Sequence, residues 1–127
     1  MKYLIFIRHC ESFREAGPPQ ALMDAMGEFV QRSLRSGVLV DTGGLLPSRE
    51  GARIRLENGC IRVLDGPFTE SKEVIGGWAI LSTDSRAEAI RIAREFMELH
   101  QRHWPAFEGE SELRPMYEPG CGPEPRA

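Results

Sequence analysis

The segment DGPFTESKE, residues Asp65–Glu73, separates two strand-like stretches at 60–64 and 74–82. Its glycine gives the backbone freedom, and its proline fixes φ at about −65°. An ordinary hairpin needs about two to five turn residues and seldom carries so many ionisable side chains. The segment therefore predicts either a structured corner that positions carboxylates or a solvated loop.

On both sides of this corner, the sequence predicts further strands and two helices. The helix at 20–36 has apolar side chains three and four positions apart and ends at Gly37, while Ser85 and Glu88 form a capping box before the second helix. Asn58-Gly59 is a strong hairpin signal. In chain order we predict a strand at 3–8, a helix at 20–36, a strand beginning at 38–40, hairpin strands at 52–56 and 60–64, a strand at 74–82, a helix at 86–101 and an edge strand at 112–118.

Without the hairpin, this order is βαββαβ, the ferredoxin-like α+β pattern in which both helices cover one face of an antiparallel sheet. The other face would carry Phe6, Trp78 and Ile80 with no helix to cover them. An uncovered apolar face of that size usually has a partner. We therefore expect two such sheets to meet face to face in a symmetric homodimer.

Composition narrows the class of protein further. The 127 residues are 41% apolar with a net charge of −3, so we expect one domain at 1–118 and a flexible Pro/Gly-rich tail at 119–127. The charge disfavours nucleic-acid binding, and the apolar runs are too short for a membrane span. The start of the chain is unlike a signal peptide, and the three cysteines form no zinc pattern, so we expect a cytoplasmic protein with free thiols.

The run at 65–73, followed by Gly76-Gly77-Trp78, resembles the signature of the DGPF-type branch of the YCII-related family. The segments at 1–4 and 112–118 resemble that family's first and last strands. The resemblance implies a dimeric α+β barrel of ferredoxin-like protomers, with a cleft near the dimer interface. It also implies a bacterial protein, and some family members are encoded beside, or fused to, extracytoplasmic-function sigma factors.

Two hypotheses about function follow. In the first, the chain forms a small homodimer that binds a small polar metabolite in the cleft. If this homodimer is an enzyme, it would transform the metabolite without a cofactor. In the second, the chain is a non-catalytic regulatory or interaction module linked to a sigma factor. A pocket with convergent polar groups would favour the first, and a second exposed apolar patch would favour the other.

Acidic side chains supply the first set of candidate site residues. Asp65 is the leading one, either as an acid–base or ligand-orienting group or as the cap of a local turn. Asp41, after the second strand, is a candidate ligand-binding carboxylate. Glu70 and Lys72 either bind a ligand or form a salt bridge with each other.

Histidines supply the second set. The wider YCII-related family is thought to use a His–Asp pair with the histidine on the first helix, but residues 20–36 contain no histidine. His9 is therefore the second catalytic candidate and His103 a candidate for ligand binding, whereas His100 reads as a packed or helix-capping residue. No metal-ligand cluster occurs at helical spacing, and we expect no metal or cofactor.

Overall fold

The computed structural model describes residues 1–10, 17–68 and 74–117. Its antiparallel four-stranded sheet has the order β2-β5-β1-β6, and β3 and β4 form a separate two-stranded sheet. The elements are β1 (Lys2–His9), α2 (Gln20–Ser36), β2 (Leu39–Gly44), a 3₁₀ turn (Ser48–Glu50), β3 (Ala52–Glu57), β4 (Cys60–Asp65), β5 (Val74–Ser82), α3 (Arg86–His103) and β6 (Gly109–Pro115). The predicted α+β order with an inserted hairpin is confirmed.

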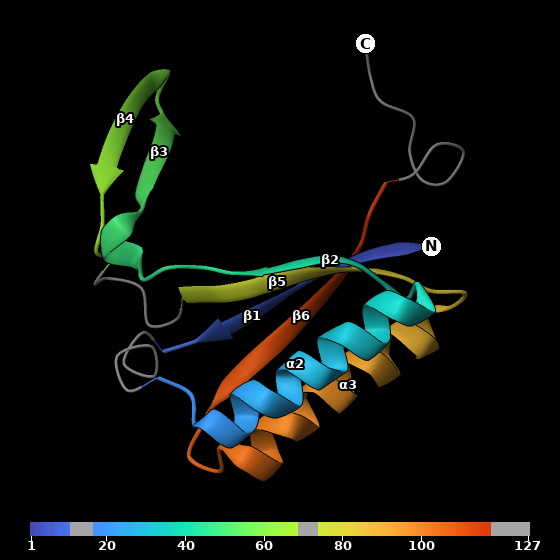
Figure 1. Cartoon of the computed structure of the whole chain (residues 1–127). Coiled ribbons are helices and arrows are strands. Elements are labelled where there is room, and N and C mark those ends of the chain that lie inside the picture. The colour runs from blue at the N-terminus through green and yellow to red at the C-terminus, as the bar shows by residue number, and fades with distance from the viewer. Residues whose placement is uncertain (11–16, 69–73, 118–127) are drawn as a thin grey trace.

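Both helices lie on one face of the four-stranded sheet (Figure 1). Tyr3 and Ile5 of β1 are buried against Phe29 of α2 and Ile92 of α3. Burying an aliphatic or aromatic side chain of this kind stabilises a fold by about 1.5–3 kcal/mol. The core therefore lies between β1 and the two helices.

Local signals set the ends of both helices as the sequence predicts. Gly37 takes a left-handed conformation with φ of 82°, and its N–H bonds the carbonyl of Leu34 at 3.2 Å. At the start of α3, the Ser85 hydroxyl accepts from the Glu88 N–H at 3.1 Å. Neither described helix is long and apolar enough to cross a membrane.

The strand register divides the side chains of the sheet between its two faces. Phe6 lies directly opposite Trp78, and Leu4 lies opposite Ile80, so these side chains share a face. Because Ile5 and its neighbours in register pack on the helices, the Phe6 set points away from them. We call this surface (Leu4, Phe6, Trp78 and Ile80) the open face; all four side chains are half-buried.

The predicted hairpin is confirmed and projects from the sheet. Asn58 and Gly59 have φ values of 50° and 76°, as a tight two-residue turn requires. The hairpin β3–β4, called the arm below, rises on the side of the sheet opposite the helices (Figure 1). It therefore stands on the same side as the open face.

The corner at residues 65–68 holds the base of the arm. The Gly66 N–H bonds the Gly51 carbonyl at 2.9 Å, and the Phe68 N–H bonds the Ser48 hydroxyl at 3.1 Å. A Cβ atom at Gly66 would overlap the carbonyl group of Ser48. This part of the corner is therefore a packed structure, while residues 69–73 lie outside the described part of the chain.

The last strand lies earlier than predicted. It runs from Gly109 to Pro115 and not from 112 to 118, because it pairs with β1 along its whole length, from Gly109 opposite His9 to Pro115 opposite Tyr3. Its place at the edge of the sheet is confirmed. Pro115 is tolerated there because an edge strand leaves one row of backbone groups unpaired.

The packing of the corner gives a direct test. We expect Gly66→Ala to destabilise the protein by about 1–3 kcal/mol, because the added methyl group meets backbone atoms of Ser48 that cannot rotate away. Urea unfolding would measure the loss. Gly27→Ala is the matched control, since that helical position has open space and should be neutral or slightly stabilising. Equal stability of the two variants would contradict this account.

Candidate functional site

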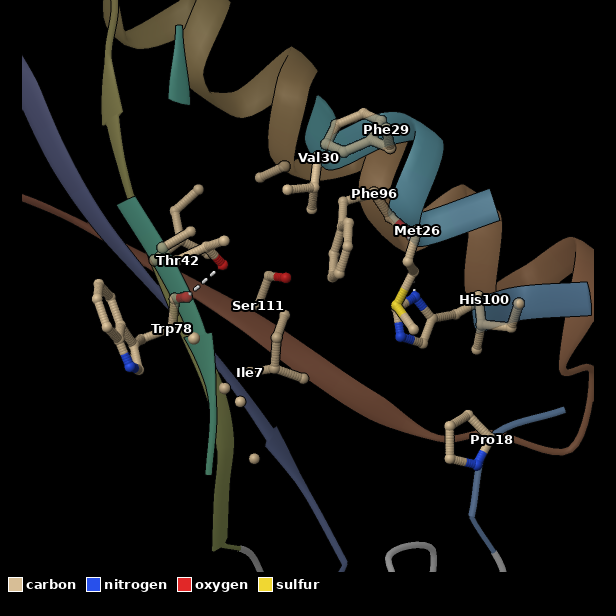
Figure 2. Close-up of a pocket in the computed structure, with 18 of the residues that line it drawn as sticks. Ile7, Pro18, Met26, Phe29, Val30, Thr42, Trp78, Phe96, His100 and Ser111 are labelled. Atoms are coloured by element: carbon tan, nitrogen blue, oxygen red, sulfur yellow. Dashed lines mark hydrogen bonds between the residues drawn. The ribbon is translucent and has the colours of Figure 1, made fainter. Parts of the chain in front are cut away.

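A cavity of about 610 Å³ lies between the helices and the sheet. Small-molecule sites usually have volumes of about 300–1,000 Å³. Met26, Val30 and Phe96 line it from the helix side, while Ile7 and Ser111 line it from the sheet side (Figure 2). The wall is thus mainly apolar.

Two histidines are the only titratable side chains among the described residues that line this cavity. His9 ends β1 and His100 lies in the last turns of α3, and they are 5% and 7% exposed. Both rings pack near Phe107, with centroid distances of 6.1 Å for His9 and 4.9 Å for His100. The fold therefore brings together histidines that are 91 positions apart in the sequence.

The hydrogen bond of His9 defines its tautomer. Its Nδ1 lies 2.8 Å from the carbonyl oxygen of Cys10. Because a carbonyl only accepts, Nδ1 must carry the proton, and in the neutral ring Nε2 keeps its lone pair. Nε2 lies against Gly76, where a Cβ atom would overlap it. The β1–β5 register also shifts here, between Ile7 and Arg8.

His100 has the same arrangement on the opposite wall. Its Nδ1 lies 3.1 Å from the Phe96 carbonyl, so this nitrogen donates and Nε2 remains an acceptor. Burial lowers the pKa of His100 below its ordinary value of 6.5; the bond to Phe96 acts in the opposite direction, and the charge of His9 lowers the pKa further. His100 is therefore a neutral base at pH 7.

A third polar group in the lining is the hydroxyl of Ser111. Its Oγ is buried and has no hydrogen-bond partner among the described residues. Ser111 lies opposite Ile7 in the β1–β6 register and points toward the cavity (Figure 2). An unpaired buried hydroxyl costs about 1–3 kcal/mol, so it is a natural partner for a bound polar group. Thr42 differs, because its hydroxyl already donates to the Trp78 carbonyl at 2.8 Å.

The structure separates the predicted site residues. His9 lines the cavity, whereas Asp65 is exposed at the end of β4 and Asp41 is exposed on β2. The Asp41 carboxylate accepts from the Thr42 N–H at 2.8 Å, a local contact. His103 is the last residue of α3 and does not line the cavity.

The two remaining candidates, Glu70 and Lys72, lie outside the described residues. Within the described ranges, no group of three His, Cys, Asp or Glu side chains is placed to hold a metal ion. The polar side-chain groups of the residues in the described lining are therefore two imidazoles, hydroxyl groups such as that of Ser111, and the indole N–H groups of tryptophans.

Sequence reasoning missed His100 and Ser111 as site residues. His100 continues the apolar stripe formed by positions 93, 96 and 97 of α3, and the prediction that it is a packed residue is confirmed by its burial. The sequence carried no signal that a cavity would remain beneath that stripe. Such a cavity depends on how far the helices stand from the sheet.

Residues 1–99 match the YCII-related domain. The chain belongs to the YCII-related family. An uncharacterised protein of Rhizobium meliloti (strain 1021) is 33% identical over 125 residues, which cover 94% of this chain and 97% of the relative. In this YCII-related protein the helix α2 has no histidine, and the cavity histidines come from β1 and α3.

The pKa of His100 predicts a pH dependence of stability. Because the pKa is lowered in the folded state, the unfolded chain takes up the proton first, so stability falls as the pH drops below about 6.5. His100→Asn keeps a donor for the Phe96 carbonyl but cannot titrate, and should lose this component. Urea unfolding at pH 7.5 and 5.5 would measure it.

The control for that experiment is His103→Asn, which removes a partly exposed histidine of the same helix that does not line the cavity. It should keep the wild-type fall in stability. An equal fall in wild type and in His100→Asn would show that His100 does not cause it.

Proposed function

We propose that this YCII-related protein binds a small, largely apolar molecule in the cavity and holds its polar end with His9 and His100. The observation that supports this is the pairing of an apolar wall with two buried imidazoles. Apolar lining with few, convergent polar groups is typical of small-molecule sites. The DGPFTESKE run supports a place in the DGPF-type branch of the family.

The chemistry of the polar groups narrows the ligand. Both Nε2 atoms are left as hydrogen-bond acceptors in the neutral rings, because both Nδ1 atoms are engaged by carbonyls. A molecule with a hydroxyl group that donates a hydrogen bond would satisfy them. The described lining contains no carboxylate or cationic chain, so it fits a mainly apolar molecule better than the strongly polar metabolite expected from the sequence.

The same groups would also support a reaction. A neutral imidazole near pH 7 is an effective general base. His100 has this character because burial lowers its pKa. We propose that an imidazole Nε2 takes the proton of the bound hydroxyl group, so that the histidine becomes an imidazolium and the ligand an oxyanion. Asp65, on the arm and outside the lining, has no comparable support as the acid–base group.

Matched probes test the proposal. The protein should bind 2-naphthol more tightly than naphthalene, since only the naphthol donates a hydrogen bond. One such bond is worth about 1 kcal/mol, or about fivefold in Kd. In His9→Asn/His100→Asn, the amide N–H groups can replace the Nδ1 donors but both Nε2 atoms are absent, so this preference should fall while naphthalene binding is retained. Fluorescence titration would measure both affinities.

Two further variants locate the binding. Val30→Trp fills the cavity from α2 and should abolish binding of both probes, whereas His103→Asn lies outside the lining and should change neither. An unchanged naphthol preference in the double variant would show that the histidines do not hold the polar end of the ligand. Binding that survives Val30→Trp would show that the probes do not bind in the cavity.

We also propose that the open face joins two copies in a homodimer, as the sequence led us to expect. The half-buried Phe6, Trp78 and Ile80 support this, because both described helices cover the opposite face of the sheet (Figure 1). Sheets that pack face to face lie about 10 Å apart and interlock such side chains.

The proposed dimer should dissociate when a charge is placed on the open face. Ile80→Glu places a carboxylate in the middle of the open face and should convert a dimer into a monomer, because an unpaired buried charge is strongly unfavourable. Ile90→Glu, on the outer side of α3, is the control and should remain dimeric. Sedimentation velocity at micromolar concentration would measure both. A wild-type monomer would rule out the dimer.

A further inference from the structure

The arm has one apolar face that faces water in the isolated chain. Ile54 pairs with Val63 and Leu56 pairs with Ile61, so the four side chains share a face. Each is 67–69% exposed. Isolated large apolar residues are common on surfaces, but two adjacent cross-strand pairs form a contiguous patch, which usually marks an interaction site.

The other face of the arm is its polar side. Arg55 lies opposite Arg62, and Arg62 forms a salt bridge with Glu57 at 3.2 Å. The guanidinium of Arg53 lies 3.9 Å from the ring centre of Phe68 in the corner. The arm therefore has a wet face and an apolar one, as a strand pair packed against another body would have. A two-stranded hairpin alone is marginally stable in water.

The position of the arm indicates what covers the apolar face. The corner holds the base of the arm through Gly66 and Ser48, and the arm rises on the side of the open face (Figure 1). Its strands have six residues each, a reach of about 20 Å. A second sheet packed on the open face would lie about 10 Å away, within that reach.

We propose that each arm packs its apolar face on the second copy of this chain, so that two protomers clasp each other. This inference rests on the dimer proposed above and adds a second contact to it. Two-fold symmetry uses both arms equally and leaves neither apolar face in water. The regulatory hypothesis would instead require another protein to bind this patch. The experiments below must distinguish that outcome from the clasp.

The first experiment compares the two faces of the arm. Leu56→Glu should raise the dimer dissociation constant by about 30-fold or more, the effect of losing one central apolar contact at an interface. Arg55→Glu, the neighbouring residue on the wet face, should change it by less than about threefold. Both residues are exposed in the single chain, so the protomer fold should survive. Sedimentation over a concentration series would measure the constants.

The second experiment places a thiol on the apolar face, because the native Cys60 lies on the wet face with Arg62. In Cys10→Ser/Cys60→Ser/Cys121→Ser/Ile61→Cys, a benzophenone attached at position 61 should cross-link to the other protomer, read by mass spectrometry of mixed light and heavy isotope-labelled protein. Cross-links confined to one protomer would overturn the proposal.

The outcomes separate the arm from the open face. If Ile80→Glu dissociates the dimer while Leu56→Glu leaves its dissociation constant unchanged, the dimer stands, the clasp is wrong, and the patch belongs to another partner. If the wild-type protein is a monomer, both proposals fail. Neither result affects the probe-binding test of the cavity.

Discussion

The alternation of side chains along β1 is the constraint on which the rest of the structure depends. β1 pairs with β5 on one side and β6 on the other, so neither of its edges is free. Ile5 and His9 therefore point toward the helices, and Phe6 points to the open face. A shift of one residue would exchange these sets, remove a histidine from the cavity and bury Phe6 in the core. One strand thus sets both the chemistry of the site and the character of the opposite surface.

Two glycines allow close packing, one at the cavity wall and one at the base of the arm. Gly76 leaves room for the imidazole of His9 against β5, and Gly66 leaves room for the carbonyl group of Ser48 beneath the arm. The first shapes the cavity wall and the second sets the position of the arm. The DGPF segment is therefore informative mainly about how the hairpin is held. Its carboxylate, Asp65, stands exposed at that junction and does not line the cavity.

Local sequence signals predicted most of the fold and less of the site. The hairpin and helix ends were correct because Asn58-Gly59, Ser85 and Gly37 act within a few residues of themselves. The last strand was misplaced because its limits depend on pairing with β1, a long-range contact. His9 was identified, but His100 was not, since only the separation of helices and sheet creates a cavity at its ring.

The two histidines are close enough for the charge of one to act on the other. Burial lowers the pKa of His100, and a positive charge on His9 lowers it further. The pair therefore favours a single added charge over two, and a lone imidazolium in an apolar cavity is stabilised by an anion beside it. A ligand that gives up one proton supplies that anion. Under the binding proposed above, a weakly acidic molecule would fit best, because its bound anion and a protonated histidine would stabilise each other where no described carboxylate does.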